Sequence, residues 1–237
     1  MRPNGWFRGP HYAHLVPLTT LTSPLLGATT TVLVGDDGTC VVVDPGGGVV
    51  PELREVVERE GWRPVALLAT HGHADHTWSA AELCARWGVP LYVHEADAYR
   101  LDDPLGTLGP LGSQLLAMSG LPAPEPPGDV RTFAVAPGEA IDLDLGGGPS
   151  IRALHLPGHT EGSTVYLVDG TTMLAGDILF AGSVGRTDLP GGDMRAMTVT
   201  LDTLALMDPG WTVIPGHGPQ TTLGAEQRTN PYLRALR

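Results

Sequence analysis

The sequence predicts an α/β fold, an αββα sandwich in which two mixed β-sheets lie between helices. Short β-branched runs alternate with segments of helical periodicity in both halves of the chain, and no linker separates the halves. Gly (32 residues) and Pro (22 residues) make up nearly a quarter of the chain, which favours many short elements joined by tight loops over a helix bundle. We therefore expect residues 1–237 to form a single domain.

The first half begins with a predicted hairpin. Two β-branched runs at 31–35 and 39–44 flank Asp36-Asp37-Gly38, a turn sequence typical of hairpins. Residues 51–60 follow as a helix, with Pro in the first turn, apolar residues three and four apart, and Gly61 as its stop. The remaining elements of this half are a buried strand at 65–69, a helix at 77–87 and a strand at 90–94.

Residues 101–129 are rich in Pro, Gly and Leu and are too irregular for one regular element, so they form either a lid over a pocket or a long connector. Residues 193–207 then form an amphipathic helix whose stripe of Met194, Met197, Leu201 and Leu204 is expected to face the core. The other elements of this half are strands at 130–135, 140–145, 151–156, 163–169, 172–175 and 212–214, and a short helix from 224 to the end.

Composition excludes several classes of function. The formal net charge is −12 and the isoelectric point is near 5.0, so a nucleic-acid partner is not expected. The sequence has no apolar run that approaches a membrane span and no signal-type segment at its start, which predicts a cytoplasmic protein without a membrane partner. Cys40 and Cys84 lie in apolar surroundings and are expected to be reduced core thiols.

Five of the nine histidines lie in three loops that each follow a predicted buried strand. In the first loop, His71 and His73 can direct two imidazoles at one ion, whereas Asp75 and His76 fall past the next bend and can face a second. The other chemistry-bearing residues at strand ends are His159, Asp177 and His217. Nitrogen and carboxylate ligands of this kind suit zinc, iron or manganese.

The remaining histidines are expected to be structural. His11 and His14 lie in the leader, His94 ends a strand, and His155 can at most support a ligand.

The pattern HxHxDH, together with the three later residues, resembles the metallo-β-lactamase fold superfamily over nearly the whole chain. The segments PGHTEGSTVYL, LAGDILF, GRTDLPGGD, PGHG and EQRTNPYLR resemble the short glyoxalase II-like hydrolases of that superfamily. The resemblance implies two divalent metal ions, most simply zinc, with iron or manganese as alternatives. It assigns His71, His73 and His159 to the first metal, Asp75, His76 and His217 to the second, and Asp177 to the bridge between them.

The resemblance implies hydrolysis of a small-molecule thioester by a metal-bridging hydroxide, with Asp75 orienting the hydroxide and the thiolate departing without a dedicated general acid. Four alternatives use the same fold. A mononuclear Fe(II) sulfur dioxygenase acting on a persulfide would use His71, His159 and Asp177, and a lactonase or other ester hydrolase would use the same hydroxide. A lactam hydrolase is disfavoured because those enzymes lack the carboxylate bridge, and a nuclease is disfavoured by the charge.

The C-terminal Asn230-Pro231-Tyr232 turn resembles the place where glyoxalase-like enzymes carry cationic side chains. Here Arg234 and Arg237 follow it with a spacing that puts both on one helix face. They either bind a carboxylate of the thiol carrier or are two solvated arginines at a frayed terminus. The sequence does not define the acyl group, the carrier or the oligomeric state.

Overall fold

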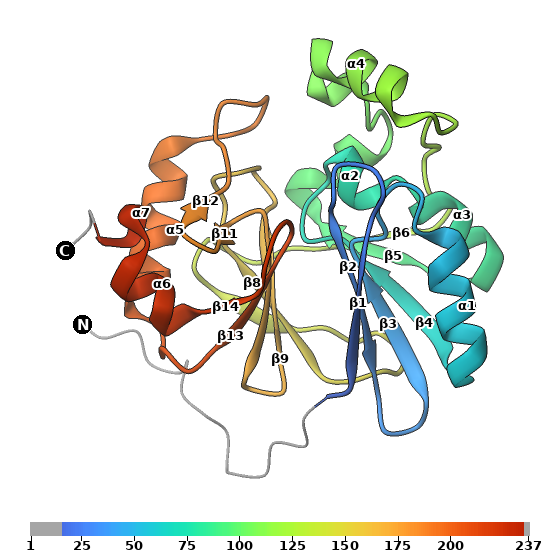
Figure 1. The fold of residues 1–237 in the computed structure, drawn as a ribbon, viewed down its shortest axis with the longest axis horizontal. Helices are drawn as coiled ribbons and strands as arrows, with labels where there is room; N and C mark the ends of the chain where they lie inside the picture. The colour runs from blue at the N-terminus through green and yellow to red at the C-terminus, as the bar shows by residue number, and fades with distance from the viewer. Residues whose placement is uncertain (1–15, 235–237) are drawn as a thin grey trace.

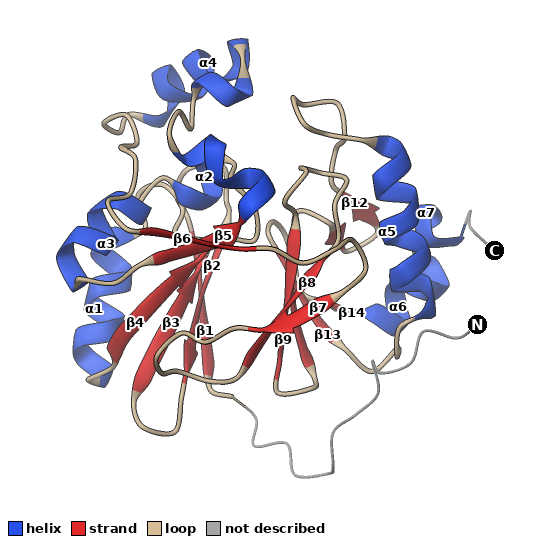
Figure 2. Ribbon diagram, turned by 180° about the vertical axis from the view of Figure 1, so that it is seen from behind, coloured by secondary structure: helices blue, strands red, loops and turns tan. Residues whose placement is uncertain are grey.

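The computed structural model describes residues 16–234 and confirms the αββα sandwich (Figures 1 and 2). Two mixed six-stranded sheets pack face to face, with strand orders β1-β2-β3-β4-β5-β6 and β14-β13-β10-β9-β8-β7. Within the described residues no helix is long and apolar enough to span a membrane. Arg237, His11 and His14 lie outside the described residues.

The first sheet is built from the predicted hairpin and the parallel strands that follow it. Strands β2 and β3 pair antiparallel, with Val32 opposite Val42, and β3, β4, β5 and β6 then run parallel. Its strands are β1 (Leu18–Thr22), β2 (Thr29–Val34), β3 (Thr39–Val43), β4 (Arg63–Leu68), β5 (Leu91–His94) and β6 (Val130–Phe133). Helices α1 (Val50–Glu60) and α3 (Ala80–Trp87) cover its outer face.

In the second sheet, β8 and β10 both run antiparallel to β9, and β13 runs parallel to β10. The carboxyl ends of β8, β10 and β13 therefore meet at one edge. Its strands are β7 (Ala140–Asp142), β8 (Ile151–His155), β9 (Thr164–Val168), β10 (Thr172–Gly176), β13 (Thr212–Pro215) and β14 (Thr221–Thr222). Helices α5 (Met194–Leu206), α6 (Leu223–Thr229) and α7 (Pro231–Arg234) cover its outer face.

Three apolar layers hold the sandwich together. The middle layer joins the two sheets through residues such as Leu33, Leu68 and Tyr166, each with no exposed surface. Each outer layer packs helices on one sheet, with Leu53 of α1 against the first and Leu204 of α5 against the second. Close packing of this kind fixes the edge where the two sheets present their loops.

The structure corrects several sequence-based expectations. The predicted helix at 77–87 is two helices, α2 (Ala74–Thr77) and α3, because the ligand loop itself turns helical. Residues 101–129 contain a regular ten-residue helix, α4 (Pro110–Ser119). Met194 is 61% exposed because it occupies the first position of α5, ahead of the buried stripe. The C-terminal helix is interrupted at Asn230, where Pro231 starts α7.

Candidate metal centre

The seven predicted ligands lie together at the edge where both sheets end. His71 and His73 follow β4 of the first sheet, and His73 is the residue that precedes α2. Asp75 and His76 lie within the single turn of α2. His159, Asp177 and His217 follow β8, β10 and β13 of the second sheet.

The first group consists of His71, His73 and His159, whose side chains are almost completely buried. Nδ1 of His73 lies 3.1 Å from Nε2 of His71 and 3.0 Å from Nε2 of His159. Three ring nitrogens therefore converge on one point. This arrangement suits a tetrahedral cation with one position open.

The second group consists of Asp75, His76 and His217. Nε2 of His217 lies 3.2 Å from Oδ2 of Asp75 and 3.2 Å from Nε2 of His76. Asp75 therefore supplies a carboxylate that the first group lacks, and the two groups differ in charge.

Asp177 lies between the two groups. Its Oδ1 is 3.3 Å from Nε2 of His76, and its Oδ2 is 3.7 Å from Nε2 of His159. Oδ1 is buried and has no hydrogen-bond partner, and the same holds for Nε2 of His73. A buried carboxylate oxygen without a hydrogen-bonding partner is costly, and a cation at this point would satisfy it.

The protonation states also fit a metal. Burial lowers the pKa of His73 to about 3, and burial together with the neighbouring histidines holds the pKa of His71 well below its usual range. Both rings are therefore neutral near pH 7, the form that binds metals. Burial would also lower the pKa of His76, but Asp177, Asp75 and Asp44 outweigh it and raise that pKa in the metal-free protein. The carboxylates around His76 thus favour positive charge where a second cation would lie.

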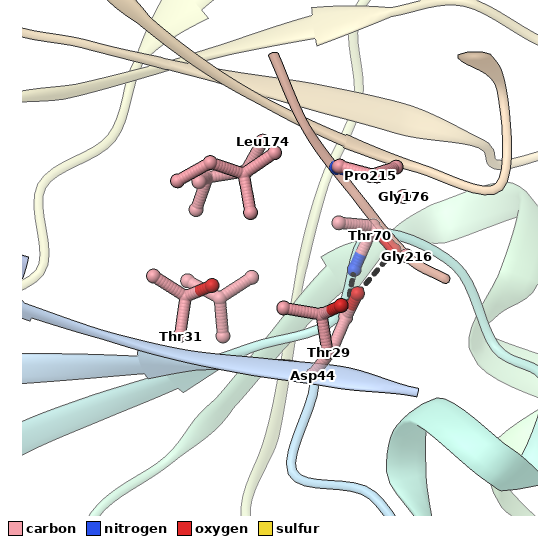
Figure 3. A pocket seen from close by; sticks show the side chains of 10 residues that line it. Thr29, Thr31, Asp44, Thr70, Leu174, Gly176, Pro215 and Gly216 are labelled. Atoms are coloured by element: carbon pink, nitrogen blue, oxygen red, sulfur yellow. Dashed lines mark hydrogen bonds between the residues drawn. The ribbon is translucent and has the colours of Figure 1, made fainter. Parts of the chain in front are cut away.

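Asp44 orients candidate ligands of both groups, although the sequence pattern did not identify it. Its Oδ1 accepts a hydrogen bond from the backbone N–H of Thr70 at 2.7 Å, and its Oδ2 accepts one from the Thr70 hydroxyl at 2.7 Å (Figure 3). Oδ2 also lies 3.0 Å from Nδ1 of His76, and the Thr70 hydroxyl lies 3.1 Å from Nδ1 of His71. One carboxylate therefore orients a ring in each group. The available signal was its place directly after the buried strand β3, like the ligands after theirs.

Backbone groups hold two of the other rings. The carbonyl of Arg186 lies 2.8 Å from Nδ1 of His159, and that of Leu26 lies 3.1 Å from Nδ1 of His217. Each contact leaves Nε2 facing the centre.

Gly216 in the PGHG segment leaves room for the side chains of Asp177 and His76 beside the backbone. A Cβ at this position would collide with Oδ1 of Asp177 and would lie 2.9 Å from Cε1 of His76. The glycine is therefore needed for close approach beside the ligands.

A cleft of about 540 Å³ opens onto the centre. Five of the seven ligands contribute to its lining, namely His73, Asp75, His159, Asp177 and His217. Residues from α4 and from the β11 (Leu179–Phe180) and β12 (Ser183–Val184) hairpin line much of the rest, together with Leu26, Leu108, Arg186 and Leu189. The volume lies within the range of about 300–1,000 Å³ that is usual for small-molecule sites. A second cavity, of about 10 Å³ beside Thr70 and Asp44, is too small for a substrate.

The remaining predicted residues lie elsewhere. Arg234 is exposed on α7 and is not part of the cleft lining. The Asn230 amide instead donates hydrogen bonds to the carbonyls of Ser183 (3.0 Å) and Phe180 (3.4 Å), so this turn holds the hairpin that lines the cleft. His94 and His155 stack on each other, with ring centroids 3.9 Å apart, away from the ligands.

This fold and this set of nitrogen and oxygen ligands define a metal-dependent hydrolase. The family model of the metallo-beta-lactamase superfamily matches residues 25–217. The chain belongs to that superfamily.

Relatives cover almost the whole chain. The chain is 40% identical over 227 residues to an uncharacterized protein of Mycobacterium tuberculosis, covering 92% of this chain and 98% of that protein. It is 34% identical to the probable metallo-hydrolase YqgX of Bacillus subtilis, covering 86% and 91% of the two chains. It is 32% identical to the hydroxyacylglutathione hydrolase GloC of Haemophilus influenzae, covering 84% and 90%.

Two solved structures have the same fold over nearly their full length. The BLEG-1 B3 metallo-beta-lactamase aligns with a TM-score of 0.76 at 30% identity, covering 92% of this chain and 99% of that chain. TTHA1623 in a di-iron-bound form aligns with a TM-score of 0.76 at 34% identity, covering 90% and 99%.

Proposed function

We propose that the protein hydrolyses a thioester at a two-metal centre, in the manner of glyoxalase II-like enzymes. The position of Asp177 carries the proposal, because its Oδ2 lies 3.7 Å from Nε2 of His159 in the first group and 3.6 Å from Nε2 of His217 in the second. Each group offers three ligand atoms, so two ions would have ligands of their own. The relative named hydroxyacylglutathione hydrolase supports the reaction class.

Each candidate residue has a proposed role. One ion would be held by His71, His73 and His159, and the other by Asp75, His76 and His217. Asp177 would bind both ions. When bound, such ions lower the pKa of water and polarise a carbonyl. Asp75 directs one oxygen, Oδ2, toward His217, and its other oxygen is left to accept a hydrogen bond from the attacking water and orient it. Because a thiolate is a good leaving group, no further acid is needed.

Zinc is the proposed metal, with iron or manganese as alternatives; the di-iron form of TTHA1623 makes iron a specific competitor. The substrate is a small molecule, and the net charge of −12 makes a nucleic-acid partner unexpected. A cytoplasmic location is part of the same proposal.

Metal quantification on protein purified without chelator, combined with a thioester panel that includes lactoyl-glutathione, tests the proposal. We expect close to two ions per chain and thioester hydrolysis that is lost on chelation and restored by metal. One iron per chain with oxygen uptake on a persulfide substrate would instead indicate the sulfur dioxygenase. Hydrolysis of a lactone or of a β-lactam without thioester turnover would also overturn the proposal.

A further inference from the structure

The walls of the cleft identify the acyl group that it accommodates. One wall comes from α4 and from the short helix η2 (Gly106–Leu108). It contributes four apolar side chains and a single polar one, Gln114; the apolar residues are Leu108, Leu111, Leu115 and Met118.

Helix α4 presents this wall through its spacing. Leu111, Leu115 and Met118 are four and three residues apart and therefore lie along one face of the helix. Leu115 anchors the helix, because it is buried in one apolar cluster with Trp78 and with Ala74 of α2. Leu111 and Met118 are left 40% and 78% exposed. The fold thus holds uncovered apolar surface beside the metal centre, which is typical of a binding site.

The rest of the lining is also mostly apolar. It includes Phe180, Val184, Leu189, Leu26 from the loop between β1 and β2, and the polar Ser183. Among the described lining residues, Arg186 is the one charged side chain that is not a candidate ligand, and Asp188 holds its guanidinium at 2.6 and 2.8 Å. A hydroxylated two- or three-carbon acyl group would therefore leave most of these walls in contact with water.

We propose that the substrate carries an aliphatic acyl chain of medium length, which lies along α4 with its carbonyl at the metal centre. This inference rests on the proposed thioester hydrolysis. The face from Leu111 to Met118 is about 10 Å long at 1.5 Å per residue, which matches an extended chain of about eight carbons. The cleft would therefore select an acyl group by the length of its apolar chain, whereas a lactoyl group presents a hydroxyl and a single methyl.

A homologous series tests the proposal. S-acetyl, S-butyryl, S-hexanoyl, S-octanoyl and S-lactoyl N-acetylcysteamine are compared on the protein purified without chelator. We expect kcat/KM to rise about threefold to fourfold per methylene up to octanoyl, the ratio expected for burying one methylene. The lactoyl thioester should be slower than the hexanoyl one. Values that are flat or fall with length, or a maximum at lactoyl, would overturn the inference.

Two exposed residues provide matched variants that leave the fold intact. Met118 in α4 and Leu206 in α5 are each 78% exposed, but only Met118 lines the cleft. Met118→Gln should lower kcat/KM for the octanoyl thioester at least threefold and by a larger factor than for the acetyl thioester, whereas Leu206→Gln should alter neither. Equal effects of Met118→Gln on both substrates would contradict a role for α4 in reading chain length.

A binding measurement separates failure of this inference from failure of the proposed function. Calorimetric titration of the same protein with the thioethers S-methyl and S-hexyl N-acetylcysteamine requires no turnover. Tighter binding of the hexyl compound that is weakened by Met118→Gln supports an apolar binding cleft. If this binding is seen but no thioester is hydrolysed, the cleft is confirmed and the proposed function is wrong. Thioester hydrolysis with no difference between the two thioethers keeps the function and overturns the acyl inference.

Discussion

The buried carboxylate of Asp97 accepts a hydrogen bond of 2.8 Å from the backbone N–H of Gly72. Gly72 lies between His71 and His73. The same oxygen accepts a hydrogen bond from the Thr160 hydroxyl at 2.7 Å, and the other oxygen accepts one from the backbone N–H of Gly162 at 2.9 Å. One side chain therefore joins the two loops that carry the first group of ligands.

Replacing Asp97 with Asn should weaken metal binding at that group. An amide keeps the size but exchanges one acceptor for a donor, so at least one of the loop contacts is lost. We expect the metal dissociation constant to rise about tenfold, as for other residues that orient ligands, when measured by competition with a chelator. Asp129→Asn is the control, because Asp129 is exposed and pairs with Arg131. A lower melting temperature of the metal-free variant with unchanged metal affinity would limit Asp97 to a role in folding.

Removal of the bridging carboxylate should abolish activity. Asp177→Ala takes away the only described side chain that lies between both ligand groups, so two cations would repel each other without a shared anion. We expect metal content to fall below two ions per chain and kcat to fall at least a hundredfold, a loss of about 2.7 kcal/mol or more of transition-state stabilisation.

His94→Ala is the matched loss of a buried polar side chain outside the centre. His94 accepts a hydrogen bond from the backbone N–H of Ala96 at 3.2 Å and stacks on His155. Its removal should lower the melting temperature while metal content and turnover persist. Substantial activity in the Asp177 variant would show that the bridge is not required.

The two cysteines should be inert in the native protein. Burial raises the pKa of Cys40 to about 12 and that of Cys84 to about 11, and both thiols are free. Only a small fraction is thiolate at pH 8, and reagents cannot reach it. We expect Ellman's reagent to release no colour from the folded chain within minutes and two equivalents after unfolding without reductant. Fewer than two equivalents would indicate a disulfide, and protection that depends on added metal would indicate ligation.

The sequence was sufficient to predict which seven residues the fold brings together at one edge. These candidate ligands follow strands and carry side chains with few structural uses, so their positions stand out along the chain. Asp44 and Asp97 could not be assigned in the same way. Asp44 bonds to Thr70, which is 26 residues away in the sequence, and Asp97 bonds to Gly72, which is 25 residues away. Only tertiary packing brings these partners together.

Helix α4 was missed for a different reason. Its segment contains Gly112 within the helix and Gly109 and Gly120 at its ends, and these residues suggest turns. The helix is stabilised by burial of Leu115 in an apolar cluster that includes Trp78, which local propensity does not reveal. The sequence left open whether residues 101–129 form a lid over a pocket or a connector. The structure shows that an apolar helix from this segment lines the cleft, which contradicts the expectation that the segment is irregular.

Two arginines are candidates to bind the carboxylate of an anionic thiol carrier. Arg186 lines the cleft, whereas Arg234, assigned from the sequence, lies outside the lining. The Arg186 side chain is 54% exposed and its Nε and Nη2 already hold Asp188, so a carboxylate would meet a partly screened cation. Arg186→Ala should therefore lower kcat/KM for a glutathione thioester by about tenfold, the lower end of the range for a hydrogen bond to a charged group.

The comparison with Arg234→Ala decides which arginine acts. The backbone carbonyl of Arg186 holds His159, and an Ala substitution leaves that contact in place, so metal content should not change. A neutral N-acetylcysteamine thioester should be spared in both variants, and the Arg186 effect should shrink at high salt because the attraction is screened. A selective loss on the glutathione thioester in Arg234→Ala alone would assign the carrier to the C-terminal turn. Equal losses on neutral and anionic thioesters would show that neither arginine distinguishes the carrier.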